Sequence, residues 1–314
     1  MVMREVKYIE SSVEEKTTNA TQRVDEIDFE VYSPENIDDM GKYIELHGER
    51  TRLEKVIERA DKPYLIYGAK GLGKTNLIHS ICKDNGYALI EFNCGVGTTK
   101  SDFQGRLQVD DKGSYFQRGL LPIAYEVANH YKHAVCYLDE IGATEYELQK
   151  WLNRPLDSRN SVFAGGKIYR LNEGCKLAFI ATTNPIEYAG VNNLTEDLKS
   201  RFIGSQWDYP SSDELNRIIN WNKIPEELRG ALTTFAQDTY SLRTKNDVDY
   251  ALSPRDMNQF TSVYRDIMED TDEDVEESLE VSFKEAFLIK YTDPSERELI
   301  KSRAEETLGV TFSS

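Results

Sequence analysis

The sequence lacks most features that mark secreted, metal-binding and membrane-spanning proteins. Its four cysteines, Cys82, Cys94, Cys136 and Cys175, lie far apart and form no CxxC motif or Cys/His cluster with metal-ligand spacing. We expect reduced, mostly buried thiols. No apolar run approaches the roughly 20 residues that span a bilayer, and the first residues lack the apolar core of a signal peptide. The sequence therefore predicts a cytoplasmic protein with no membrane span.

Positive charge is also scarce. The 314 residues contain 38 Lys and Arg against 55 Asp and Glu, which gives a formal net charge of −17. Such a charge repels a phosphate backbone at long range and argues against a protein that coats nucleic acid, although a local basic patch can override the average. With 39% hydrophobic and 30% charged residues, the composition is that of a globular protein long enough for one large or two modest domains.

Three regions follow one another along the chain. Residues 1–41 are polar and predict a loosely docked N-terminal extension. Over residues 42–210, the apolar runs "PYLIY", "YALIEF", "AVCYL" and "KLAFIAT" alternate with helical patterns, as expected for strands buried on both faces of a parallel sheet. Residues 211–314 carry helical patterns alone. The predicted fold is α/β, a parallel sheet sandwiched by helices and followed by a small all-α domain.

A glycine-rich stretch, "GAKGLGKT" at residues 68–75, fits the phosphate-loop pattern G-x-x-x-x-G-K-[ST] and lies between an expected strand and an expected helix. Its glycines let backbone N–H groups turn toward one point, where the helix N-terminus adds positive potential. Lys74 adds a full charge for the β and γ phosphates, and the Thr75 hydroxyl suits Mg²⁺. An ordinary glycine-rich turn is the alternative. The expected nucleotide-binding residues are Gly68, Ala69, Lys70, Gly71, Leu72, Gly73, Lys74, Thr75 and Asn76.

Two carboxylates end a later strand, in the stretch "AVCYLDEI". Successive residues of a strand point in different directions, so Asp139 and Glu140 would do different work. We expect Asp139 to face the Mg²⁺ ion through its water shell. Glu140 would polarise the water that attacks the γ phosphate. The alternative is an acidic pair that simply faces solvent.

From residue 42 to about 265 the motifs arrive in the order found in the AAA+ ATPases, and the sequence resembles their MoxR-like and dynein-related branch. The stretch "FIATTNP" resembles the sensor 1 strand, which implies that Asn184 helps to position the lytic water. The stretch "LTEDLKSRF" resembles an arginine-finger segment, in which Arg201 reaches a neighbouring subunit's nucleotide. The stretch "LSPRD" resembles sensor 2, with Arg255 touching the γ phosphate. The resemblance implies ATP and Mg²⁺ as ligands.

Two further stretches favour the MoxR-like branch. Residues 98–121 are similar to its hairpin-bearing helix 2 segment, and residues 148–171 are similar to its helix and hairpin before sensor 1. In that family both hairpins lie at the pore of a ring, where Tyr115, Phe116 and Lys167 would be found.

The two arginines also have local interpretations. Ser253 and Pro254 suit the N-cap and first position of a helix, which places Arg255 in the first turn, at the unfavourable positive end of the helix dipole. A nearby anion would explain it, and an ion pair with Asp256 or another surface acid is the alternative. For Arg201, the alternative is a surface ion pair with Asp197.

The leading functional hypothesis is an ATP-driven ring ATPase that remodels a partner protein. The resemblance implies a hexameric ring and a separate partner chain, such as a protein with a von Willebrand-type metal site. A nucleic-acid motor or McrB-type restriction NTPase is the second hypothesis, because Arg159, Lys167 and Arg170 lie in a stretch without acids. A nucleotide-gated scaffold without turnover is the third. Nothing in the sequence decides between ATP and GTP.

Overall fold

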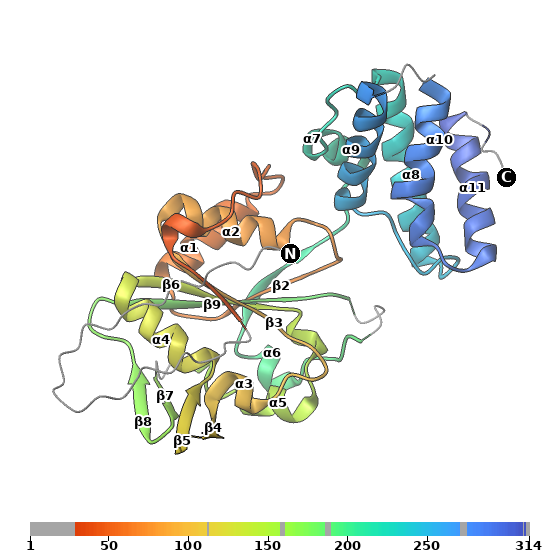
Figure 1. The fold of residues 1–314 in the computed structure, drawn as a ribbon. Coiled ribbons are helices and arrows are strands. Elements are labelled where there is room, and N and C mark those ends of the chain that lie inside the picture. Colours follow the sequence, from red (N-terminus) through yellow and green to blue (C-terminus); the bar gives the residue numbers. More distant parts are fainter. Residues whose placement is uncertain are drawn as a thin grey trace. The chain divides into compact units, whose positions relative to one another are not determined.

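The four apolar runs become strands of one six-stranded sheet: β2 (Tyr64–Gly68), β3 (Ala88–Asn93), β6 (His133–Asp139) and β9 (Lys176–Thr183). The strand order is β1-β3-β6-β9-β2-β10, and β6 pairs in parallel with both β3 and β9 (Figure 1). The parallel core is therefore confirmed. The sheet as a whole is mixed, because β1 (Glu30–Tyr32) pairs antiparallel with β3.

The computed structural model describes residues 29–111, 113–157, 161–185, 190–270, 275–309 and 311. These residues pack into two compact units. One comprises the residues up to Met40, Thr51–Leu65 and Ile78–Gly204, and the other comprises Gly41–Arg50, Ile66–Leu77 and the residues from Ser205 onward. Residues 1–28 of the predicted extension lie outside the described residues. Farther along, this predicted extension contains β1 and a short 3-10 turn at Pro34–Asn36.

Helices cover both faces of the sheet, as predicted. Figure 1 shows α1 (Glu49–Arg59) and α2 (Lys74–Asn85) on one face and α4 (Leu120–Tyr131) on the other. The remaining elements before the helical region are α3 (Lys100–Gln104), α5 (Tyr146–Leu152), α6 (Glu196–Lys199) and the last strand, β10 (Ile203–Trp207). All four cysteines are free and buried, as expected, and burial raises the pKa of the Cys82, Cys94 and Cys136 thiols.

Both expected hairpins are present. They are formed by β4 (Gly105–Asp110) with β5 (Gly113–Arg118), and by β7 (Ser161–Ala164) with β8 (Lys167–Arg170). The two hairpins touch, because a Cβ atom on Gly165 would lie 2.4 Å from the Phe116 ring. Gly165 also has a positive φ of 55°, so both its space and its backbone conformation favour glycine.

The helical region contains α7 (Ser212–Ile218), α8 (Glu226–Thr244), α9 (Pro254–Asp270), α10 (Val275–Ala286) and α11 (Pro294–Leu308). Aromatic rings fill its core, where Phe260 stacks on Phe287 with 4.7 Å between ring centroids. The last helix, α11, lies in the region expected to be helical, with Asp293 as its cap and Pro294 at its first position. None of the described helices combines the length and apolar character that a membrane crossing needs.

The helix that follows the glycine-rich loop is anchored to the sheet by a buried polar pair. His79 on α2 lies 2.8 Å from the Glu91 carboxylate on β3, and its side chain is 5% exposed. The Tyr32 ring of β1 packs edge-on against the same imidazole. A second pair on α2, between Lys83 and Asp39, spans 3.2 Å but lies at the surface.

We expect Glu91→Ala to lower the free energy of unfolding by about 1–3 kcal/mol, because it leaves a buried imidazole without its partner. Asp39→Ala is the matched control, because it removes the partner of Lys83 on the same helix, and it should cost less than about 1 kcal/mol, as exposed ion pairs do. Urea unfolding of the two variants and the parent measures both values. Equal losses in the two variants would contradict the assignment of His79 and Glu91 as the anchor.

Candidate active site

The glycine-rich loop connects β2 to α2, as the motif predicts. β2 ends at Gly68 and α2 begins at Lys74. Gly71 and Gly73 have φ values of 78° and 86°, in the left-handed region that glycine adopts without strain. Because α2 is 12 residues long, the positive end of its dipole lies at the loop and favours an anion there.

Lys74 folds back over the loop that precedes it. Its ammonium group donates to the carbonyl oxygens of Gly68 at 2.6 Å and Ala69 at 2.8 Å, and the residue is 8% exposed. Thr75 follows in the first turn of α2, where its hydroxyl is a hard oxygen donor of the kind Mg²⁺ prefers. The loop therefore has the strand–loop–helix context and the glycine conformations that the phosphate-loop motif predicts.

The N-terminus of α9 packs directly on this loop. A Cβ atom on Gly71 would lie 2.2 Å from the Ser253 hydroxyl and 3.4 Å from the Arg255 Cβ atom. The helix begins at Pro254, as predicted, and Ser253 precedes it as the N-cap. This contact brings the predicted sensor 2 arginine next to the phosphate loop.

Arg255 is exposed and, within the described part of the chain, makes no ion pair. The alternative partner, Asp256, is buried and bonded elsewhere. Its carboxylate accepts from the Ser253 N–H and the Tyr250 hydroxyl, both at 2.8 Å, and lies 3.4 Å from the Lys290 ammonium. The Arg255–Asp256 ion pair considered from the sequence is therefore not formed.

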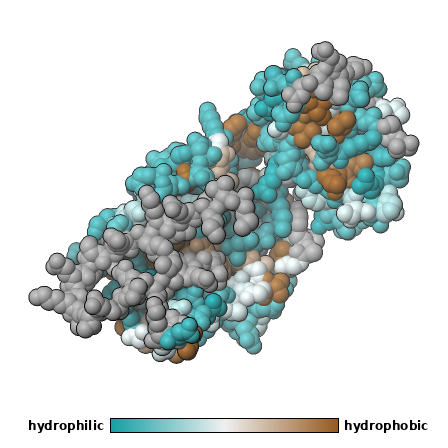
Figure 2. Space-filling model, in the orientation of Figure 1, coloured by the Kyte–Doolittle hydropathy of each residue, from teal (hydrophilic) through white to brown (hydrophobic). Residues whose placement is uncertain are grey.

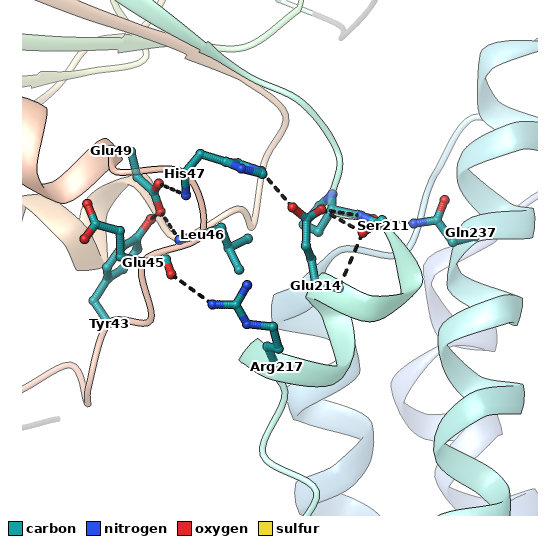
Figure 3. A network of polar contacts seen from close by, with 10 residues as sticks. Tyr43, Glu45, Leu46, His47, Glu49, Ser211, Glu214, Arg217 and Gln237 are labelled. Carbon is teal, nitrogen blue, oxygen red and sulfur yellow. Dashed lines mark hydrogen bonds and ion pairs between the residues drawn. The ribbon is translucent and has the colours of Figure 1, made fainter.

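Residues 41–50 form another part of the loop's surroundings that no sequence motif indicated. A Cβ atom on Gly73 would lie 3.5 Å from the Tyr43 ring, and that ring lies 6.4 Å from the indole of Trp207. The Tyr43 hydroxyl donates to Glu49 at 2.7 Å (Figure 3). Burial alone would raise the Glu49 pKa, but hydrogen bonds from the Leu46 N–H and the Tyr43 hydroxyl hold it below its ordinary value.

The same segment is tied to α7 by two polar contacts. The His47 imidazole lies 2.8 Å from the Glu214 carboxylate, and Arg217 donates to the carbonyl oxygen of Glu45 at 3.5 Å (Figure 3). Hydrogen bonds from the backbone and hydroxyl of Ser211 lower the Glu214 pKa, which keeps this carboxylate ionised beside the imidazole. The stretch before α1 is thereby fixed to the helical part of its own unit.

The predicted acidic pair lies at the end of β6, in the other unit. One oxygen of Asp139, Oδ1, accepts from the Tyr137 hydroxyl at 2.7 Å, from the Glu140 N–H at 3.1 Å and from the Thr182 hydroxyl. Its other oxygen, Oδ2, accepts none of these bonds. Asp139 is half-buried, and its Oδ1 is occupied by these bonds. Such a carboxylate suits a residue that holds Mg²⁺ through water.

Glu140 has an unusual backbone conformation, with φ 54° and ψ 41°. Non-glycine residues in this region are uncommon and concentrate at functional sites. The Asn184 side-chain amide donates to Glu140 Oε1 at 3.0 Å. The structure thus brings the predicted sensor 1 residue to the predicted catalytic glutamate. Thr182 and Tyr137 lie within the same two stretches, but the sequence assigned them no role.

Arg201 is half-exposed and faces a carboxylate of its own chain. Its guanidinium lies 3.7 Å from Asp157, and the two side chains are 40% and 30% exposed. The partner is therefore Asp157 rather than Asp197, the residue considered from the sequence. Ion pairs this exposed contribute little to stability, so Arg201 remains available for another anion at small cost.

Comparisons with known proteins find relatives for part of the chain. Residues 63–202 match the model of the AAA domain, dynein-related subfamily. Protein CbbQ of Hydrogenophilus thermoluteolus is 24% identical over 157 residues, which cover 50% of this chain and 57% of CbbQ. Midasin of Giardia intestinalis is 26% identical over 170 residues, which cover 54% of this chain and 3% of midasin. The match thus spans little more than half of CbbQ and a small part of midasin.

Two solved structures also resemble this one at low sequence identity. A structure described as an ATPase from Cytophaga hutchinsonii has a TM-score of 0.41 and 17% identity, over 83% of this chain and 81% of its own. A structure from work on katanin self-assembly has a TM-score of 0.46 and 14% identity, over 90% of this chain and 88% of its own. Because both TM-scores are low, the resemblance to the AAA family rests on the domain match and on the motifs. The match at residues 63–202 is to the AAA domain of the dynein-related subfamily, the family that the motifs resemble.

Proposed function

We propose that the chain hydrolyses ATP with the residues described above. The observation that carries the proposal is the hydrogen bond from Asn184 to Glu140. This bond holds the Glu140 carboxylate at the end of β6, and a group that orients water needs such a fixed position. Main-chain N–H groups of the loop and Lys74 would bind the β and γ phosphates. Arg255, exposed at the loop and without an ion-pair partner among the described residues, would stabilise charge on the γ phosphate.

Thr75 and Asp139 are the residues that would hold Mg²⁺, and both supply hard oxygen donors. When bound, the ion neutralises charge on the phosphates and leaves the transfer itself to positioned protein groups. Glu140 would accept a hydrogen bond from the attacking water, and Asn184 would keep the Glu140 carboxylate in place. ATP rather than GTP is proposed from the family alone.

We also propose that Arg201 acts in a neighbouring subunit of a ring, as the family resemblance implies. Its loose contact with Asp157 at the surface supports this, because an arginine committed to its own subunit would be expected in a tighter pair. The hexameric state is part of the same proposal. The cytoplasmic location stays a prediction.

The partner we propose is a polypeptide with apolar segments. Four apolar side chains of the two hairpins are 55–78% exposed: Leu107, Val109, Phe163 and Ile168. Figure 2 shows small brown areas among teal at the hairpin end of the first unit. Apolar surface of this kind suits protein better than a phosphate backbone, although Lys167 and Arg170 are exposed there too. Stimulation of hydrolysis by an unfolded polypeptide supports this partner, and stimulation by DNA alone favours the nucleic-acid hypothesis.

Lys74→Ala is expected to abolish ATP binding, whereas Glu140→Gln should bind ATP like the parent and turn it over at least about 100-fold more slowly. The lysine charge acts on the bound ground state, but the glutamate acts chiefly on the attacking water. Equilibrium binding of a fluorescent ATP analogue and phosphate release measure the two effects. An equal loss of ATP affinity in both variants would refute this division of roles.

Arg201→Ala should lower turnover by at least about tenfold with little change in ATP affinity, because an arginine finger acts mainly in the transition state. Mixing Arg201→Ala chains with Lys74→Ala chains should restore part of the activity, since some interfaces then combine an intact loop with an intact arginine. Asp157→Ala is the matched control, because it frees Arg201 without removing it, and should retain activity. If the mixtures assemble but stay inactive, Arg201 does not act in a neighbouring subunit's site.

A further inference from the structure

Thr182 makes two different hydrogen bonds with the acidic pair. It is fully buried on β9, and its hydroxyl donates to Asp139 Oδ1. The same oxygen atom accepts the Glu140 N–H at 3.1 Å. A hydroxyl has one proton to donate, so the bond to the carboxylate fixes the direction of that proton and leaves a lone pair for the Glu140 N–H. Thr182 therefore contacts the side chain of one acid and the main chain of the next.

The main-chain contact falls on the residue with the left-handed backbone. Glu140 has positive φ although it is not glycine, a conformation that persists only where its surroundings hold it. Its N–H is shared between Asp139 Oδ1 and Thr182 Oγ1, both at 3.1 Å. Of these two acceptors, Asp139 ends the same strand that leads to Glu140, and Thr182 ties the Glu140 main chain to the neighbouring strand β9.

Thr182 lies near the end of β9, and Asn184 follows directly after the strand. Thr182 holds the N–H of Glu140 and Asn184 holds its carboxylate. The strand end thus fixes both the backbone and the side chain of this glutamate. Tyr137, which is fully buried, adds a third donor to Asp139 Oδ1 and orients that carboxylate from its own strand.

We propose that Thr182 is a positioning residue for hydrolysis: its hydroxyl holds Glu140 in the left-handed conformation that directs the carboxylate at the attacking water. This inference rests on the proposed ATP hydrolysis. Without the hydroxyl, the Glu140 N–H loses one of its two acceptors and Asp139 loses one of its three donors. The Glu140 backbone then relaxes, and its carboxylate moves away from the position that Asn184 supports. Binding of ATP, which depends on the phosphate loop, is left nearly unchanged.

The test compares variants that differ by one hydroxyl group. Thr182→Val keeps the shape and removes the hydroxyl, and Thr182→Ala and Thr182→Ser form a second pair that differs in the hydroxyl alone. We expect Thr182→Val and Thr182→Ala to lower kcat by about tenfold or more, because hydrogen bonds that involve charged groups are among the stronger ones. KM for ATP should stay within about twofold, and Thr182→Ser should recover most of the activity.

Thr183→Val is the matched control. Thr183 is also buried on β9, but its neighbouring position in the strand turns it to the other side. Its hydroxyl donates to the carbonyl oxygen of Asn184 at 3.3 Å and packs against Gly142. This control should turn over ATP like the parent. Tyr137→Phe should lower kcat less than Thr182→Val, because it leaves the Glu140 N–H bonded. Thermal unfolding of every variant separates lost turnover from lost structure.

The inference is overturned if Thr182→Ala and Thr182→Ser have the same kcat, or if Thr182→Val turns over ATP within about twofold of the parent while Glu140→Gln is inactive. Should Thr182→Val fail to fold, the Ala and Ser pair decides the question alone. A parent chain that does not hydrolyse ATP, or a Glu140→Gln variant as active as the parent, refutes the proposed function instead.

Discussion

The parallel register of β6 with β9 is the constraint on which the acidic pair depends. Leu138 pairs with Ala181, so the next position along each strand brings Asp139 opposite Thr182. Because side chains alternate along a strand, a slip by one residue would replace the Thr182 hydroxyl with a residue from the other side. The buried apolar residues of both strands hold this register, and the polar contacts at the strand ends follow from it.

The phosphate loop is organised by a different kind of contact, the close approach of other backbone and side chains to its glycines. Ser253 fills the space that a side chain on Gly71 would need, and Tyr43 lies against Gly73. A larger residue at Gly71 would push away the cap of α9, whereas a Cβ atom at Gly73 would meet the Tyr43 ring at ordinary contact distance. The glycines therefore serve both the turn of the loop and the packing of its neighbours.

Much of this arrangement follows from local sequence. The four central strands are continuous apolar runs, the phosphate loop has a fixed spacing, and Ser253 with Pro254 marks the start of α9 before the structure is known. These features depend on residues close together in the chain, where periodicity, caps and turns leave a direct signal. The acidic pair is found for the same reason, because it directly follows a buried strand.

The remaining features depend on residues far apart in the chain. In the sequence, Thr182 is one of several β-branched residues in an expected strand. Its contacts become visible only from the register that places it opposite Asp139. Tyr43 belongs to a segment without a motif, and β1 is three residues long and lies in a polar stretch. The ion-pair partners of Asp256 and Arg201 are not the residues next to them in the sequence. Tertiary packing brings Lys290 to Asp256 and Asp157 to Arg201.

The central claim is that this chain is an ATPase whose glutamate is positioned for turnover. The most direct test is phosphate release by the unmodified chain supplied with ATP, with Mg²⁺ and with the metal chelated. The account predicts sustained release over many turnovers per chain that requires Mg²⁺. ATP that binds tightly but is never hydrolysed, at any protein concentration, would contradict it and favour a nucleotide-gated scaffold.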